Sequence, residues 1–111
     1  MIEKSVCDYL NEVMGLPAFW EKPEDELEEF LIVEKTGGKE TEHIKSATIA
    51  VQSYAGSMYR AAEINEAVKA VMEHMTELEG VSRVDLNSDY NFTDTTTKQY
   101  RYQAVFDIVH Y

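Results

Sequence analysis

The sequence predicts an α+β fold, a two-layer sandwich in which two main helices cover one face of a small, mainly antiparallel sheet of about four strands. Apolar residues recur at intervals of three and four near the N-terminus and again in the middle of the chain, as in helices with one apolar face. Segments rich in β-branched and aromatic residues follow each helix and read as two hairpins. Neither kind of element buries its apolar face alone, so the helices are expected to pack on the sheet.

The first helix is predicted to make about three turns from the N-terminus. Gly15 can adopt the left-handed conformation that follows a helix, and Pro17 prevents the helix from continuing. Residues Pro17 to Trp20 are then expected to be extended or irregular. The expected apolar face consists of Ile2, Val6, Tyr9, Leu10, Val13 and Met14.

The long central helix is predicted from about Ser57 to Leu78. Ser57 is a suitable N-cap, because its hydroxyl can accept a hydrogen bond from a free backbone N–H of the first turn. Gly80 supplies the stop. The apolar stripe along this helix consists of Ala61, Ile64, Val68, Val71, Met75 and Leu78.

The first hairpin is predicted from the strand Phe30–Thr36 and the returning strand Ile44–Tyr54. Gly37-Gly38 is a turn signal, and the polar residues Lys39 to His43 suggest a longer loop. In the returning strand the odd positions are apolar and are expected to face the core, whereas Thr48 and Gln52 face the other way. The core-facing residues of that strand are Ala47, Ile49 and Val51.

The second hairpin is predicted from strands over residues 81–92 and 100–110, with the loop Asp94–Lys98 between them. Both strands alternate, so one parity of each is expected to face the core. The residues of that parity are Val84, Leu86, Tyr90 and Phe92 in one strand and Tyr100, Tyr102, Ala104, Phe106 and Ile108 in the other.

Length and charge limit the possible functions. The 111 residues predict one domain spanning 1–111, and a hydrophobic content of 44% is typical of globular chains. The formal net charge is −11, which disfavours direct binding of nucleic acid. The acidic residues gather between Glu21 and Glu42. They indicate either a solvated loop that aids solubility or a charged rim that faces a partner subunit.

Targeting signals are not evident in the sequence. No apolar run reaches the roughly 20 residues of a membrane span, so no membrane partner is expected. The first residues lack the apolar centre of a signal peptide, and Cys7 is the only cysteine. These features favour the cytoplasm.

No residues are predicted to be catalytic, cofactor-binding or metal-binding. The sequence contains no phosphate-binding loop, dinucleotide-binding motif, nucleophile elbow or zinc-protease motif. His43, His74 and His110 are scattered over a loop, a helix and a strand, without the spacing of a zinc site. Cys7 has acidic neighbours, which oppose a reactive thiolate, and is interpreted as a packed side chain.

The aromatic residues are the other unusual part of the composition. Most of the tyrosines and phenylalanines in the strands have core-facing parity, and few basic residues lie among them, so stacking on nucleic acid is not expected. An aromatic sheet face or edge can also form a subunit interface, where Tyr and Trp are enriched. For Trp20, in an irregular segment, both core packing and an interface remain open.

The chain resembles the small tail-terminator and tail-completion proteins of long-tailed phages and prophages. The resemblance covers essentially the whole chain and rests on the order of its elements and on particular phrases. The most distinctive phrase is Val51-Gln52-Ser53-Tyr54-Ala55 leading into the long helix. The other phrases are Val6-Cys7-Asp8-Tyr9-Leu10-Asn11, Phe30-Leu31-Ile32-Val33-Glu34-Lys35-Thr36-Gly37-Gly38, Ser57 with Ala61-Ala62, and the closing strand Tyr102–Ile108.

The resemblance implies a non-enzymatic subunit of a ring, commonly a hexamer. Such a ring caps the finished tail tube and joins it to the head connector, so the implied partners are other copies of the chain, the tail tube protein and the head connector protein. The implied location is the virion tail, assembled in the cytoplasm of the bacterial host. From exposure alone, the expected interface residues are Phe19, Trp20, Lys39, His43, Asp94 and Lys98.

Other functions remain open at this stage. Within the same group of assembly proteins, the chain can be a head–tail stopper or a minor tail protein. In a different class, it can be a small regulatory or ligand-binding domain of ferredoxin-like type that dimerises through its sheet. An enzyme is the third alternative, and it requires a pocket with converging carboxylates and histidine.

Overall fold

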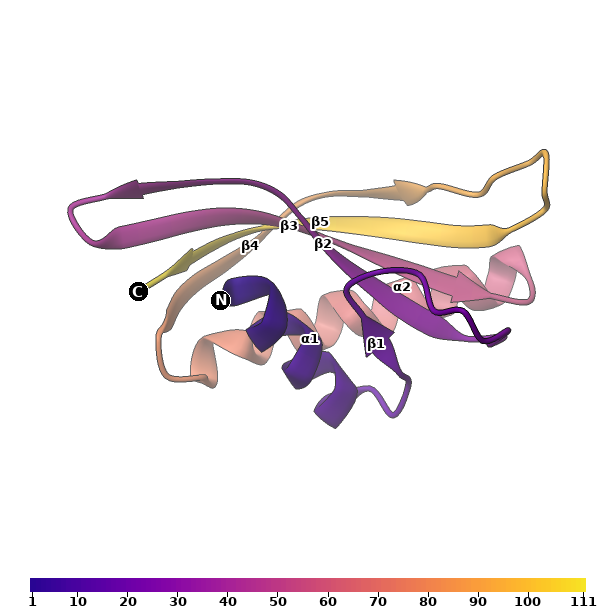
Figure 1. Cartoon of the computed structure of the whole chain (residues 1–111), viewed down its shortest axis with the longest axis horizontal. Helices are drawn as coiled ribbons and strands as arrows, with labels where there is room; N and C mark the ends of the chain where they lie inside the picture. Colours follow the sequence, from indigo (N-terminus) through magenta and orange to yellow (C-terminus); the bar gives the residue numbers. More distant parts are fainter.

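The computed structural model describes every residue from Met1 to Tyr111. It is a two-layer α+β structure in which the helices lie against one face of a five-stranded sheet (Figure 1). The elements in chain order are α1 (Ile2–Val13), β1 (Ala18–Phe19), β2 (Phe30–Thr41), β3 (Ile44–Ala55), α2 (Met58–Met72), the 3-10 helix η1 (Glu73–Glu77), β4 (Val81–Asn91) and β5 (Tyr100–His110). The predicted fold class is therefore confirmed.

The sheet has the order β1-β2-β3-β5-β4. The short strand β1 is parallel to β2, and every other pair is antiparallel. The sequence predicted about four strands, and β1 adds a fifth within the segment expected to be extended or irregular. Asn11 holds this segment, because its side-chain oxygen accepts a hydrogen bond from the Ala18 amide at 2.9 Å and its amide donates to the Ala18 carbonyl at 3.1 Å.

The main core lies between the helices and the sheet. The predicted core positions Ala47, Ile49 and Val51 of β3 are buried there, because alternate residues of a strand point to the same face. In β5 the predicted residues Ala104, Phe106 and Ile108 are buried, Tyr102 packs partly buried against the core, and Tyr100 lies outside it. The predicted stripe of α2 is buried at Ala61, Ile64 and Val68 and partly buried at Val71. It continues through Met72 at the end of α2 and Met75 of η1. Two predicted members lie outside the core, since Val13 and Leu78 are exposed at the ends of their helices.

The start of α2 is capped as predicted. Ser57 is extended, with φ −147°, and its hydroxyl accepts a hydrogen bond from the Arg60 amide at 3.2 Å. The helix is regular to Met72 and tightens into η1, and the chain turns away at Gly80, where φ is +89°. Gly15 follows α1 with φ +69°. These two glycines occupy a conformation that other residues rarely adopt.

Replacing Ser57 with alanine is expected to lower the free energy of unfolding by about 1 kcal/mol, because the Arg60 amide loses its partner. Urea denaturation monitored by circular dichroism measures the change. Ser57→Asp restores a side-chain acceptor and places a negative charge at the helix N-terminus, so it is expected to keep most of the stability. Equal losses in the two variants would show that the cap contributes little.

The first hairpin is longer than predicted. Gly37 and Gly38 are not a turn: they lie inside β2, paired with Thr48 and Ala47 of β3. The ladder continues to the Thr41–Ile44 pair, so the predicted loop Lys39–His43 is mostly strand. The turn is made by Glu42 and His43 alone, with φ +50° and +70°. A two-residue hairpin turn of this twist requires positive φ at both positions.

The predicted core face of β4 is wrong for three of its four residues. Only Val84 packs against the core, whereas the exposed fractions of Leu86, Tyr90 and Phe92 are 47%, 42% and 38%. β4 lies at the edge of the sheet, and its pairing with β5 is irregular between Val81 and Arg83 and between Leu86 and Ser88. Leu86 opposes the core residue Phe106 but stays exposed at this edge. The extra residue after Leu86 reverses the alternation, so Tyr90 opposes Gln103 instead of a core residue.

Candidate interaction surface

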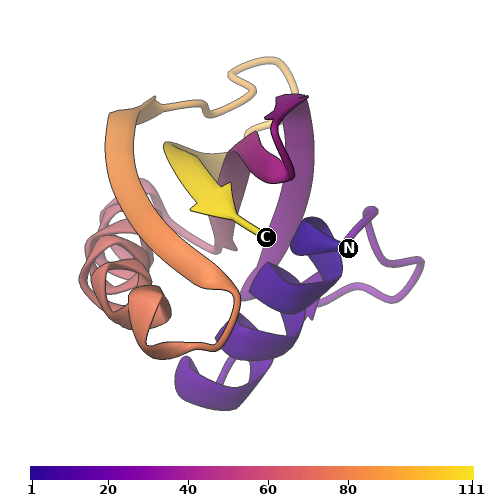
Figure 2. The ribbon, with the colours of Figure 1, turned by 90° about the vertical axis from the view of Figure 1, so that its left-hand side faces the viewer.

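The face of the sheet opposite the helices carries a chain of hydrogen-bonded side chains. No helix covers this face in either view of the ribbon (Figures 1 and 2). Gln52 of β3 and Gln103 of β5 stand opposite each other near its centre and are 8% and 9% exposed. The Gln52 amide donates to the Gln103 side-chain oxygen at 2.9 Å. Two polar side chains this deeply buried require such partners.

The chain continues in both directions from the glutamine pair. On one side the Tyr54 hydroxyl donates to Gln52 Oε1 at 3.0 Å and accepts from Arg101 at 2.9 Å. On the other side the Gln103 amide donates to the hydroxyl oxygen of Tyr90. Every bond runs in the same sense, from Arg101 to Tyr90. Within this row of side chains the Tyr90 hydroxyl only accepts a hydrogen bond, so its proton stays free for an external acceptor.

Aromatic rings flank this hydrogen-bonded chain. Phe30 stacks on Tyr54 with ring centroids 4.5 Å apart, and Phe19 meets Phe30 edge-on at 6.3 Å. Arg101, which donates to the Tyr54 hydroxyl, also places its guanidinium 4.4 Å from the centre of the Phe92 ring. The open face therefore combines aromatic rings with hydrogen-bonding groups, as protein interfaces often do.

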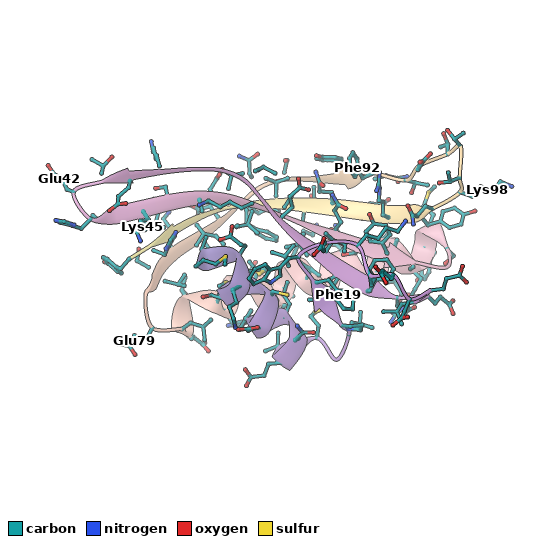
Figure 3. The ribbon with its side chains drawn as sticks, viewed as in Figure 1. Phe19, Glu42, Lys45, Glu79, Phe92 and Lys98 are labelled. Atoms are coloured by element: carbon teal, nitrogen blue, oxygen red, sulfur yellow. The ribbon has the colours of Figure 1, made fainter.

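The outer part of the first hairpin forms a second surface, which we call the arm (residues 34–45). All of its residues are exposed. In Figure 1 the arm extends beyond the helices at the left-hand end of the molecule, and Figure 3 shows Glu42 and Lys45 there. An exposed two-stranded ribbon offers side chains on both faces, so the arm is suited to contacts with another molecule.

The structure divides the predicted interface residues among three places. Lys39 and His43 belong to the arm. Asp94 and Lys98 lie in the loop between β4 and β5, at the opposite end of the molecule (Figure 3 labels Lys98).

Phe19 and Trp20 lie between these two ends, in and after β1. Phe19 is half-buried against Phe30, and Trp20 is 45% exposed. The six predicted residues thus form no single site.

The loop between β4 and β5 is well ordered by its own hydrogen bonds. Asp94 accepts from the backbone amides of Thr96 and Thr97 at 3.0 and 3.4 Å. These bonds favour the ionised carboxylate and lower the pKa of Asp94. Asp94 is therefore partly engaged in shaping the loop, whereas Lys98 is exposed and makes no ion pair.

The groups considered for chemistry do not converge. The Cys7 thiol donates to the Ala18 carbonyl at 3.1 Å, and burial raises its pKa. No group of three or more His, Cys, Asp or Glu side chains is arranged to hold a metal ion. None of the helices is both long enough and apolar enough to span a bilayer.

Sequence reasoning did not find the hydrogen-bonded chain on the open face. It placed Gln52 away from the core, but the pairing of Gln52 with Gln103 depends on the register between two strands that are distant in sequence. It also placed Tyr90 and Phe92 in the core. The only signal in the sequence that pointed to the open face is a glutamine in the middle of each of the two strands, Gln52 in β3 and Gln103 in β5.

Comparisons with known proteins assign no family to the chain: no protein-family model matches it, and no curated protein matches it.

Proposed function

We propose that this protein is a non-enzymatic assembly subunit of a long-tailed phage or prophage. It forms a ring that caps the tail tube and joins it to the head connector. The observation that carries the proposal is the order of elements along the whole chain. The order is a short helix, a first hairpin, a long helix entered from Tyr54 and Ala55, and a closing hairpin, and it is the order on which the resemblance to tail-terminator proteins rests.

The surfaces of the molecule support an assembly role. A ring needs two different patches on each subunit, because each copy contacts the next through a heterologous interface. The arm lies at one end of a molecule that measures 44 × 25 × 25 Å, and the β4–β5 loop lies at the other (Figure 1). The open sheet face lies between them. These separate surfaces fit a subunit that contacts two neighbours and a tube.

The net charge is compatible with this role. DNA must pass through the bore of such a ring, and a surface with net charge −11 repels phosphate. We therefore expect an acidic bore. A ring with a neutral or basic bore would contradict this part of the proposal.

The first test is the mass of the purified protein by light scattering, with negative-stain microscopy of the same sample. Rings with a central hole, or rings that form only on purified tail tubes and stop their growth, are the expected result. A stable dimer that ignores tail tubes would instead favour the ferredoxin-like regulatory domain. Binding to the connector without binding to tubes would favour a stopper.

Trp20→Ala is expected to weaken ring formation without changing the unfolding midpoint, because this indole is 45% exposed and directly follows the edge strand β1. Tyr59→Ala is a matched control, since Tyr59 is also an exposed aromatic residue, on the first turn of α2. Loss of folding in the Trp20 variant would place this side chain in the core. Equal ring formation by both variants and the wild type would exclude it from the interface.

A further inference from the structure

The arm carries a hollow lined by basic side chains, which we call the arm hollow. Its volume is about 370 Å³, and none of its lining residues is hydrophobic. Lys35, Lys39, Lys45 and His110 all line it, with Glu40 as the only carboxylate. Such a concentration of positive charge is unexpected in a chain whose net charge is −11.

The lysines of the arm hollow have no partners in the subunit. Lys35, Lys39 and Lys45 take part in no ion pair and no side-chain hydrogen bond, whereas Lys4 and Lys69 each hold a carboxylate within 3.0 Å. Glu40 opposes Lys45 across the hairpin, but their charged atoms do not meet within 4.0 Å. Lysines without a carboxylate partner in their own subunit remain free to pair with an incoming anion.

The space left at Gly38 and the lowered pKa of His110 both agree with unpaired lysines in the arm hollow. At Gly38 an added Cβ would come within 2.9 Å of Lys35 Cε and 3.1 Å of the Ser46 carbonyl oxygen, so the glycine leaves the space that the Lys35 side chain occupies. Burial lowers the pKa of His110, and the charges of Lys45 and Lys35 lower it further. His110 thus stands within the field of two unneutralised lysines.

The same protein also carries a negatively charged segment, which is opposite in charge to the arm hollow. The connection between β1 and β2 contains an acidic segment (residues 21–29), and its exposed carboxylates without an ion-pair partner are Glu21, Glu24, Asp25, Glu26 and Glu28. Only Glu29 is paired, with Arg60 at 2.7 Å.

The acidic segment cannot reach the arm hollow of its own molecule. The segment ends at Phe30, where β2 begins, and Lys39 is nine residues further along the same strand, which corresponds to about 30 Å. The basic and the acidic surfaces therefore lie toward opposite ends of one molecule (Figure 1). Complementary charges placed in this way can meet only between two copies, head to tail.

We propose that the arm hollow is an anion-binding site that receives the acidic segment of a second copy of the chain. The lysines of the arm contact Glu24, Asp25 and Glu26 of the neighbour, and successive copies join in one direction. This inference rests on the ring-forming role proposed above, and it names the contact that links one subunit to the next. A nucleic acid is the less suitable ligand for this site. Its long phosphate backbone is repelled by a protein of net charge −11, and three lysines do not overcome that repulsion.

The test uses reversed charges on each side of the contact. Lys39→Glu/Lys45→Glu gives a chain in which both surfaces are acidic, and Glu24→Lys/Asp25→Lys/Glu26→Lys gives one in which both are basic. Each variant alone is expected to self-associate at least roughly tenfold more weakly than the wild type in light scattering. An equimolar mixture is expected to associate again, because each surface then meets an opposite charge on the other variant.

Salt and a charge-matched variant serve as controls. Wild-type association is expected at about 0.01 M salt, where the Debye length is about 30 Å, and its loss at about 1 M, where it is about 3 Å. The arm variant Lys39→Gln/Lys45→Gln and the control variant Lys4→Glu lower the net charge by the same amount. Only the arm variant is expected to weaken association, and thermal unfolding checks that both are folded.

Several outcomes would overturn the inference. These are a wild-type chain that stays monomeric at low salt, association that both reversals leave unchanged, and a mixture that does not recover. A DNA oligonucleotide that binds the wild type more tightly than a peptide of residues 21–29, and depends on Lys39 and Lys45, would identify a nucleic-acid site instead. Tube capping that survives both reversals would refute only this contact, whereas salt-dependent association without tube capping would refute only the phage role.

Discussion

Phe106→Ala is expected to lower the free energy of unfolding by about 3–5 kcal/mol, the largest effect of any single substitution considered for this protein. Phe106 is 2% exposed in the middle of β5, and it packs in the core between the sheet and the helices. Truncation to alanine removes the apolar contacts of the ring and leaves a cavity that the surrounding side chains fill only in part. Urea denaturation followed by tryptophan fluorescence and circular dichroism measures the loss.

Phe92→Ala is the matched control for this prediction. It removes the same ring from the residue that follows β4, where 38% of Phe92 is exposed and its ring lies against Arg101 and Tyr90. The expected loss is about 1 kcal/mol or less, because most of the cost of a core truncation is absent at such a site. Similar losses at the two positions would contradict the placement of Phe106 in the core and of Phe92 on the surface.

Gln52→Leu is expected to cost about 1–3 kcal/mol of stability, although it replaces a polar side chain with an apolar one of similar size. The substitution leaves Gln103 Oε1 and the Tyr54 hydroxyl proton without their partners in a site that is largely closed to water. An unsatisfied buried polar group loses its hydration without compensation. Chemical denaturation gives the size of the effect.

The double variant Gln52→Leu/Gln103→Leu separates a hydrogen-bonded pair from simple packing. Removing both amides leaves fewer unsatisfied groups, so the double variant is expected to be less destabilised than the sum of the two single variants, by about 1 kcal/mol. Gln99→Leu is the control, because the Gln99 side chain makes no hydrogen bond, and its expected effect is within about 0.5 kcal/mol. Strict additivity would show that the two amides act independently.

The parts of the fold that the sequence predicted correctly depend on local patterns. The spacing of Ile2, Val6 and Leu10 in α1, the Ser57 cap and the alternation of Ala47, Ile49 and Val51 all reflect the geometry of one helix or one strand. Such patterns are visible in a single sequence, because every residue obeys the same period.

The errors arose where pairing between strands changes the local rule. Gly37-Gly38 reads as a turn, but the hydrogen bonds between β2 and β3 carry both strands on to Glu42 and His43. In β4, the irregularity after Leu86 reverses the parity of every later residue. The sequence around Gly37-Gly38 gives a stronger signal for a turn than for continued pairing, and the alternation in β4 gives a stronger signal than the irregularity that interrupts it.

The surfaces were harder to predict than the fold. Exposure logic selected Lys39 and His43, which the structure places on the arm, and Asp94 and Lys98, which lie at the far end of the molecule. The arm hollow also includes His110, which joins Lys45 only through the pairing of β3 with β5. Sites built from several strands become visible only when the register is known.

The irregular pairing of the edge strands has a further consequence. β1 pairs with only Leu31 and Ile32 on the outer side of β2, and the outer side of β4 is not paired at all. The pairing of β2 is irregular between Lys35 and Gly37, and that of β4 is irregular after Leu86. A kinked edge is a poor template for a strand from another molecule, so these positions guard the folded chain against open-ended stacking into fibres. Contacts between copies of the protein are then made by side chains and not by backbone hydrogen bonds between edge strands.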